Sequence, residues 1–230
     1  MSGRVAVVTG GTGALGQAVV LRLLADSVAV AVPYAVESEA RALRARLVAD
    51  GDRLLAEPVD VTDAGAMGRF VDEVVRRHGR IDILVAAVGG FAPGALVDTD
   101  RATWDRMLAL NLTSAFTAAH AVVPHMLAAG RGRVITIASR AVVPPAGGFI
   151  GYTVAKAGVI ALTQALAEET RGHGVTVNAV LPSTMDTPAN RAAMPDADRR
   201  GWVPVESVAE TIAFLARDEA SHITGSLLTV

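Results

Sequence analysis

The sequence predicts an α/β fold, a single domain in which a doubly wound parallel sheet of about seven strands carries helices on both faces. Short β-branched apolar runs alternate with helical patterns along the whole chain, as expected when each strand is followed by a crossover helix. A glycine-rich turn follows the first run, and no repeat or linker interrupts the alternation. With 230 residues and 51% apolar composition, the chain is long enough for one well-packed domain and short for two.

Composition excludes several classes of function. The net charge of -2 provides no basic surface for a nucleic acid or an anionic membrane. The chain has no cysteine, and its five histidines are scattered, with His120 and His125 five apart instead of four, so we expect no disulfide and no metal site. We find no signal peptide and expect no apolar run of membrane-spanning length, which indicates a cytoplasmic protein.

The first strand is predicted at Arg4–Val8, and it enters the glycine turn Thr9–Gly16 before a helical pattern. Strand, glycine turn and helix together are typical of the dinucleotide-binding Rossmann fold, although a plain flexible turn is the alternative. Gly10 allows the tight turn, Gly13 lets the backbone approach a pyrophosphate, and Gly16 lets helix and strand pack closely. The free N–H groups of the helix N-terminus then face the phosphates.

The second strand, Val28–Val32, carries the signal for cofactor choice. A site that prefers NAD usually has an acidic residue at the end of this strand. Here Pro33 and Tyr34 follow instead, the first acidic residue is Glu37, and the nearest arginine is Arg41. Both NAD(H) and NADP(H) stay open, and the missing acidic residue favours NADP(H).

A helix is predicted at Glu37–Ala49 and a third strand at Leu54–Val61. Asp60 ends that strand and is placed to accept a hydrogen bond from an adenine amino group. Thr62 or Asp63 is expected to cap the next helix.

The fourth strand, Ile81–Val88, opens into Gly89–Gly94, where backbone without side chains can lie along a cofactor. A long helix is predicted around Thr103 to Met126, with Asn111 inside it. Because asparagine is unfavourable in a helix interior, Asn111 indicates a buried polar role, and a structural bond to a neighbouring strand is the alternative.

Two further strands are predicted at Arg133–Ser139 and Val175–Leu181, a last helix at Glu206–Arg217 and a last strand at Gly225–Val230. The polar segment at about 183–204 is the one long irregular connection. Long irregular loops are commonly functional lids, so we expect it to be a substrate loop.

Tyr152 and Lys156 lie four apart in a helical pattern and therefore share one face. A nearby ammonium lowers the pKa of a phenol, which then exchanges a proton more readily. Lys156 is the only lysine among 21 basic residues, which argues against two ordinary helix residues. Ser139 ends the preceding strand, where its hydroxyl can hold a substrate oxygen beside the phenol.

Because ligands of parallel sheets bind beyond the carboxyl ends of the strands, these motifs are expected to converge on one crevice. Together they resemble the short-chain dehydrogenase/reductase family over the whole chain. The resemblance implies that Tyr152 is the acid/base, that Lys156 lowers its pKa and binds the nicotinamide ribose, and that Ser139 holds the substrate carbonyl. Asn111 supports a proton relay, and Thr187 touches the carboxamide or phosphate end of the cofactor.

The resemblance also implies a cofactor site and an assembly. Members of the family are commonly homotetramers or homodimers built on the two long helices, here those around Asn111 and Tyr152. The residues expected to bind NAD(P) are Gly10, Thr12, Gly13, Ala14, Leu15, Gly16, Asp60, Val61, Ala87, Gly89, Tyr152, Lys156, Pro182, Thr184 and Thr187.

The chain departs from the family pattern at several positions. Ala14 stands where a glycine is usual, Ala-Ala-Val-Gly at 86–89 replaces Asn-Asn-Ala-Gly, and Pro-Ser at 182–183 replaces Pro-Gly. These features, with the run from Leu181 to Arg191, are similar to those of dihydropteridine reductases. Ser139 and the absence of an acidic residue after the second strand do not fit that branch.

Three functions follow. The first is an NAD(P)H-dependent reductase that transfers hydride to a ketone or 3-oxoacyl carbonyl, with a pocket lined by Phe91, Val142 and the 186–202 loop. A carrier-bound substrate would require a basic patch near the crevice, to which Arg131, Arg133 and Arg171 could contribute, although a solvated arginine is the favoured alternative for each. The second is reduction of a quinonoid pterin, and the third is a non-catalytic dinucleotide-binding regulator.

Overall fold

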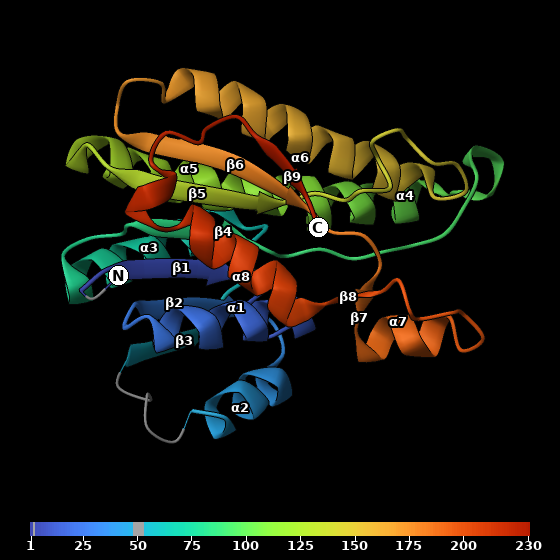
Figure 1. Ribbon diagram of the computed structural model, residues 1–230, viewed down its shortest axis with the longest axis horizontal. Coiled ribbons are helices and arrows are strands. Elements are labelled where there is room, and N and C mark those ends of the chain that lie inside the picture. The colour runs from blue at the N-terminus through green and yellow to red at the C-terminus, as the bar shows by residue number, and fades with distance from the viewer. Residues whose placement is uncertain (2, 48–52) are drawn as a thin grey trace.

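A computed structural model describes residues 1, 3–47 and 53–230. Its main sheet has seven strands in the order β3-β2-β1-β4-β5-β6-β9, and every neighbouring pair is parallel. Figure 1 shows this sheet between two layers of helices, so the predicted single α/β domain with about seven parallel strands is confirmed. The strands are β1 (Val5–Thr9), β2 (Ala29–Tyr34), β3 (Leu54–Pro58), β4 (Ile83–Ala86), β5 (Gly132–Ile137), β6 (Val175–Leu181) and β9 (Leu227–Thr229).

The helices cover both faces of the sheet. One face is covered by α1 and α8, which pack against each other, and the opposite face by α3, α5 and α6. The helices are α1 (Ala14–Ala25), α2 (Glu37–Ala45), α3 (Ala64–His78), α4 (Arg101–Leu108), α5 (Ser114–Ala129), α6 (Ile150–Glu169), α7 (Pro188–Ala193) and α8 (Val205–Leu215). Two single turns of 3-10 helix, η2 (Leu96–Asp98) and η4 (Asp218–Ala220), complete these connections.

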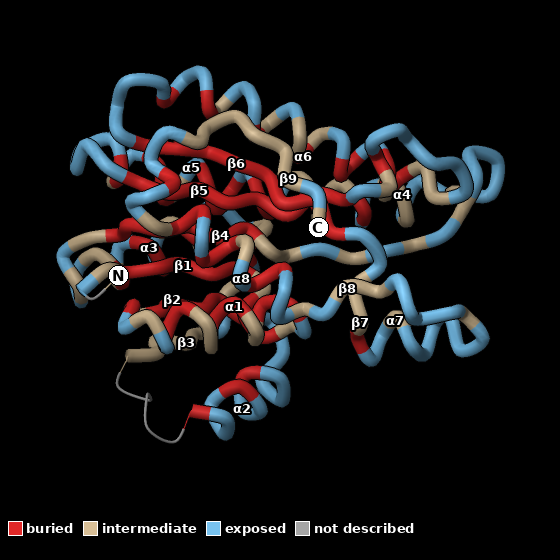
Figure 2. Tube along the Cα trace, in the orientation of Figure 1, coloured by how far each residue is buried: buried red, intermediate tan, exposed pale blue. Residues whose placement is uncertain are grey.

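Alternation along β1 explains why both faces are buried. Ala6 and Val8 join the core under α1 and α8, whereas Val5 and Val7 join the core under α3 and α5. Side chains of a strand point alternately to opposite faces, so a run of apolar residues serves two cores at once. Figure 2 shows the central strands β1, β4, β5 and β6 buried along their length, which leaves polar chemistry to the strand ends.

The hydroxyl of Thr9 is an exception in this buried sheet. Thr9 is 0% exposed, pairs with Ala86 of β4, and its Oγ1 has no hydrogen-bond partner within the described residues. A buried hydroxyl without a partner destabilises the fold. Replacing Thr9 with the isosteric valine is therefore expected to raise the free energy of unfolding by about 1 kcal/mol, measured by urea denaturation.

Thr163→Val is the matched control for this prediction. Thr163 is also 0% exposed, but its hydroxyl bonds to Thr136 and to the carbonyl of Val159. The same substitution should therefore lower stability at this position. Equal losses at both positions would contradict the role assigned to the Thr9 hydroxyl.

Several predicted boundaries require correction. β2 continues through Pro33 and Tyr34 because these residues pair with Glu57 and Pro58 of β3. The predicted third strand ends at Pro58 instead of Val61. The helix predicted to reach 49 ends at 45, and residues 48–49 of that expectation lie outside the described residues.

The long helix around Asn111 contains a turn that the sequence did not predict. Between α4 and α5 the backbone forms a π-helical turn, η3 (Ala109–Thr113), in which the N–H of Ser114 donates to the carbonyl of Ala109. The widened turn leaves carbonyls for side chains to bond. The Asn111 amide donates to the carbonyl of Met107 at 3.0 Å, and the Ser114 hydroxyl donates to that of Leu110 at 2.6 Å.

The segment at 183–204 is more ordered than an irregular loop. It contains α7 and a separate pair of two-residue strands, β7 (Met185–Asp186) and β8 (Val203–Pro204), which hold its two ends together. Figure 1 shows it projecting from one end of the sheet. Its predicted role as a substrate loop stays a prediction.

We expected no apolar run of membrane-spanning length, but two helices are long and apolar enough by length and composition alone. Two helical spans, Arg101–Ala129 and Ile150–Glu169, meet that criterion, with 50% and 39% of their most apolar windows buried in the fold. Both pack along one face of the sheet, and core helices of folded domains meet the same criterion.

Candidate active site

The glycine turn between β1 and α1 is closed by contacts that exclude a side chain. Gly10 has a φ of 70°, and a Cβ there would lie 2.7 Å from the carbonyl oxygen of Ala87. A Cβ on Gly16 would lie 1.9 Å from the carbonyl oxygen of Gly10, so the turn packs directly on α1. These contacts explain two of the three glycines that the sequence singled out.

The N-terminus of α1 remains suited to an anion. Gly13 is its N-cap and supplies no side-chain cap, and the first turn carries no acidic residue. A Cβ on Gly13 would meet only the carbonyl oxygen of Gly10, at 3.4 Å, so packing does not require glycine at 13. Ala14 is exposed, so packing also tolerates alanine where the family pattern has glycine. N–H groups and the positive end of the helix dipole thus fit a pyrophosphate.

Thr12 is linked to a residue that the sequence analysis missed. Its hydroxyl donates to Glu39 of α2 at 2.9 Å, and its carbonyl accepts from Gln17 at 2.8 Å. The next acidic residue beyond Glu37 therefore reaches the glycine turn from a helix, not from the end of β2. Apart from the acidic side chains in the first turn of α2, nothing in the sequence signals this contact.

Gly89, Asn111 and Lys156 meet after β4. A Cβ on Gly89 would lie 2.9 Å from Asn111 Oδ1 and 3.3 Å from Lys156 Nζ. Asn111 Oδ1 accepts from the N–H of Gly90 at 3.2 Å, and Asn111 Nδ2 donates to the Gly90 carbonyl at 3.0 Å. Asn111 thus ties the helix to the loop after β4, whereas the structural alternative had placed this bond on a neighbouring strand.

Lys156 is held in the protein interior. It is 5% exposed, and its ammonium donates to the carbonyl of Ile137 at 2.7 Å. Burial lowers its pKa from 10.5 to about 8, because a charged group loses hydration there. The ammonium lies 6.0 Å from the centroid of the Tyr152 ring.

The pKa of the Tyr152 phenol is raised, whereas the sequence predicted that it is lowered. Burial raises its pKa above the ordinary value, and a hydrogen bond with Ser139 offsets part of that rise. Lys156 was expected to lower this pKa, but its ammonium is engaged with Ile137. Ser139 is itself buried beside the phenol, as predicted, and its Oγ accepts from the N–H of Ala141 at 3.2 Å.

Buried Lys156 has a consequence for stability. Between pH 8 and pH 10.5 the unfolded chain binds the lysine proton and the folded chain does not, so the free energy of unfolding rises with pH across that window. Below pH 8 the penalty is complete, about 3 kcal/mol at most. Lys156→Met removes this penalty, and the loss of the donor to the Ile137 carbonyl offsets part of the gain. The variant is therefore expected to be more stable than the parent by about 2 kcal/mol at pH 7.

Urea denaturation at pH 7 and at pH 10 measures this difference. The advantage of the methionine variant should shrink at the higher pH, where the parent no longer protonates a buried amine. An advantage that is constant with pH would show that side-chain packing, not charge burial, is its cause.

The other predicted cofactor residues lie at the carboxyl ends of the strands, with their polar atoms engaged. Asp60 accepts from the N–H and the hydroxyl of Thr62, which lowers its pKa. Val61 is buried in the core, so only its backbone is available to a ligand. Asp63 caps α3, as one of the two sequence alternatives had it.

The loop after β6 is joined to the end of β5. The N–H of Arg140 donates to the carbonyl of Pro182 at 3.0 Å, and the carbonyl of Thr184 accepts from Val203 at 2.8 Å. Thr187 caps α7 through its hydroxyl. Its predicted contact with the cofactor, like the roles of Pro182 and Thr184, stays a prediction.

The arginines considered for a carrier-protein patch lie at the opposite edge of the sheet. Arg131 pairs with Asp82 at 3.4 Å before β4 begins, and Arg133 pairs with Asp218 at 3.4 Å. Arg171 follows the C-terminus of α6 and pairs with Glu168. These side chains therefore provide no basic patch beside the crevice, and their contribution to one is excluded.

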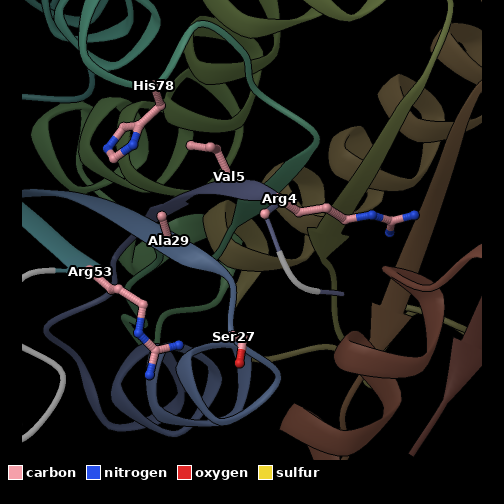
Figure 3. Close-up of a pocket in the computed structure, with 7 residues that line it drawn as sticks. Arg4, Val5, Ser27, Ala29, Arg53 and His78 are labelled. Atoms are coloured by element: carbon pink, nitrogen blue, oxygen red, sulfur yellow. The ribbon is translucent and has the colours of Figure 1, made fainter.

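A cavity also lies at this amino edge, and Figure 3 shows it between the starts of β1 and β2. It is lined by Ser27, Ala29, Arg53 and His78, with Arg4 at its margin. The guanidinium of Arg4 is bonded to Ala216, and that of Arg53 to Leu24. The cavity holds none of the predicted site residues.

Comparisons with known proteins agree with this geometry. A family profile described as short chain dehydrogenase matches residues 4–198. A (2S)-[(R)-hydroxy(phenyl)methyl]succinyl-CoA dehydrogenase subunit from Thauera aromatica is 34% identical, over 99% of this chain and 94% of its own. A 3-oxoacyl-[acyl-carrier-protein] reductase from Escherichia coli is 33% identical, over 99% and 96%. The crystal structure of levodione reductase superposes with a TM-score of 0.92 at 25% identity, covering 100% of this chain and 96% of its own.

Proposed function

This chain belongs to the short-chain dehydrogenase/reductase family, and we propose that it reduces a ketone to a secondary alcohol with Tyr152 as the proton donor. As a member it is an oxidoreductase that acts on CH–OH and C=O groups with a nicotinamide cofactor. The observation that carries the proposal is the meeting of Ser139, Tyr152 and Lys156 at the carboxyl edge of the sheet, next to Gly89 and Asn111.

Ser139, Tyr152 and Lys156 have separate roles in the proposed reduction. The cofactor supplies hydride to the carbonyl carbon. The Ser139 hydroxyl donates to the carbonyl oxygen and orients it toward the phenol of Tyr152. Tyr152 gives its proton to that oxygen as negative charge develops there. The ammonium of Lys156 lies between the Ile137 carbonyl and the backbone of Gly89, so its proposed role is to bind the nicotinamide ribose beside the phenol.

The residues present fit the cofactor at two points. The turn with Gly10 and Gly16 leaves backbone N–H groups of α1 for a pyrophosphate. The missing side chain of Gly89 lets Asn111 and Lys156 approach the end of β4 closely, and these polar groups suit a nicotinamide ribose. We place the remaining predicted contacts, including Thr184 and Thr187, along the same edge.

We also propose that the cofactor is NAD(H). The sequence favoured NADP(H) because no acidic residue ends β2, but Glu39 supplies a carboxylate at Thr12. A ribose 2′-phosphate beside Thr12 would face this negative charge. Two arginines at the end of α2 are already engaged, Arg44 with Glu37 and the carbonyl of Ala56, and Arg46 with Gln17. The carboxylate suits the two ribose hydroxyls of NAD(H).

Equilibrium binding of NADH and NADPH, measured by protein fluorescence, tests this preference. The parent should bind NADH at least about 10-fold more tightly than NADPH, since the Glu39 carboxylate would repel a neighbouring 2′-phosphate by more than about 1 kcal/mol. Glu39→Gln should narrow the gap by tightening NADPH binding, and Glu206→Gln on α8 should leave it unchanged. Tighter binding of NADPH by the parent would refute the role of Glu39.

The substrate is proposed as a ketone of the 3-oxoacyl or related type, in line with the activities of the two relatives from Thauera aromatica and Escherichia coli. Reduction of a quinonoid dihydropterin is the alternative that the loop at 183–204 suggested. Cofactor oxidation against plain ketones, a 3-oxoacyl thioester and a quinonoid dihydropterin separates them. Turnover of the pterin alone would overturn the ketone proposal.

Family members are commonly homo-oligomers, and we propose that the two long helices form the contact here. Phe116 and Leu127 of α5 and Val154 of α6 are 53%, 38% and 39% exposed. Apolar side chains of this size on neighbouring helices suit burial against a second copy. A solution mass of one chain, measured by light scattering, would exclude this contact.

A further inference from the structure

Two phenylalanine rings lie against the phenol proposed to give the proton. The ring of Phe91 lies 5.2 Å from that of Tyr152, edge to face, and 5.5 Å from that of Phe149. Phe149 and Tyr152 lie 6.0 Å apart, again edge to face. The chain has only five Phe, two Tyr and two Trp, so a third of its aromatic residues gather here.

The two phenylalanines come from separate loops that are fixed to each other. Phe91 follows β4 and Phe149 precedes α6. The N–H of Gly94 donates to the carbonyl of Gly148 at 2.8 Å, and the N–H of Ile150 donates to the carbonyl of Gly94 at 3.0 Å. These two bonds form a short parallel bridge, so the rings are held in place by backbone.

These rings are not part of the hydrophobic core. Phe91 is 61% exposed, whereas the core residue Phe70 is 2% exposed. Phe149 is half-buried. An exposed phenylalanine held against a catalytic phenol offers a free face next to the place where a carbonyl must sit. This continuity with Tyr152 argues for the substrate itself as the group that covers the rings.

We propose that Phe91 and Phe149 bind an aromatic ring attached to the carbonyl, so that the substrates are aryl ketones. The inference rests on the proposed function and names its substrate class. Edge-to-face and offset contacts between rings about 4.5–7 Å apart stabilise aromatic groups beyond their buried area. The reaction is unchanged: the carbonyl carbon gains a hydride, its oxygen gains the Tyr152 proton, and the reduced nicotinamide is oxidised.

The first test compares acetophenone with cyclohexyl methyl ketone, which have the same connectivity and differ in the aromatic ring. The parent should have a kcat/KM at least about 10-fold higher for acetophenone, the effect of two aromatic contacts. Phe91→Leu and Phe149→Leu should each lower this ratio several-fold, mainly by raising KM for acetophenone. Phe214→Leu is the matched control, because Phe214 is 42% exposed on α8, on the other face of the sheet.

A second readout does not depend on turnover. Benzamide and cyclohexanecarboxamide are compared by saturation-transfer NMR with the cofactor-free protein. Benzamide should bind more tightly, and Phe91→Leu should remove the difference.

The outcomes separate this inference from the function beneath it. Equal reduction of the two ketones, or a ratio unchanged in both leucine variants, overturns the aryl preference and leaves the reductase intact. Benzamide binding without reduction of any carbonyl in the panel supports the aromatic site and overturns the proposed function. A preference for the cyclohexyl compounds in both assays overturns the inference outright.

Discussion

Replacing Tyr152 with phenylalanine is expected to lower kcat by about 1,000-fold, while the protein stays folded and binds its cofactor. Positioned proton transfer contributes about 100- to 10,000-fold to a rate, and the phenol is the proposed donor. The ring that packs against Phe91 and Phe149 remains, so the loops around it keep their places. Cofactor oxidation measures kcat, and fluorescence titration measures cofactor affinity.

The chain provides a matched control in Tyr34, its only other tyrosine. The hydroxyl of Tyr34 donates to Glu37, away from the predicted catalytic residues. Tyr34→Phe makes the same chemical change and should keep kcat within about twofold at saturating cofactor. Near-normal turnover by the Tyr152 variant would rule out the proposed mechanism.

Lys156→Arg is expected to lower kcat/KM by about 100-fold. An ammonium on a flexible stem fits between the Ile137 carbonyl and the backbone of Gly89, where a Cβ would already lie 3.3 Å from Nζ. A guanidinium is larger and planar, and it stays charged at every working pH. It would displace Asn111 or the ribose side of the cofactor, so both kcat and cofactor affinity should fall.

Arg101→Lys is the control for this exchange. The Arg101 side chain is 85% exposed and pairs with Asp105, so the substitution should leave kinetics unchanged. Activity of the Lys156 variant within a few-fold of the parent would mean that charge alone is required at this position. The inference drawn from a single lysine in the chain would then fail.

The alternation of strands and helices could be predicted from the sequence because each element is several residues long and has the hydrophobic period of a strand or of a helix. The pairing of Pro33 and Tyr34 with β3 was not, because it depends on a partner strand and not on local pattern. The same limit applies to the catalytic residues. Spacing predicted that Tyr152 and Lys156 share a helix face, but not that Ile137 holds the ammonium.

Contacts between distant residues explain what the sequence analysis missed. Thr12 and Glu39 are joined only once α2 packs beside the glycine turn, and no periodicity encodes the direction of that helix. The clustering of Phe91 and Phe149 likewise depends on two backbone bonds between loops. Asn111 did carry a local signal, since asparagine is rare inside helices. The turn it occupies was not predicted, because one extra residue shifts the phase of the apolar pattern without changing its period.

The widened turn at 109–113 sets the two halves of one long helix out of phase. One extra residue rotates the second half relative to the first by about 100°, since an α-helix has about 3.6 residues per turn. α4 can therefore pack closely on α6, where a Cβ on Gly151 would lie 3.3 Å from Met107 Cβ, while α5 turns its apolar face to α3 and the sheet. Deleting one residue here would make the helix more regular and the protein less stable, because α4 and α5 could no longer both reach their partners. Insertions and deletions in this turn should thus be tolerated far less than substitutions.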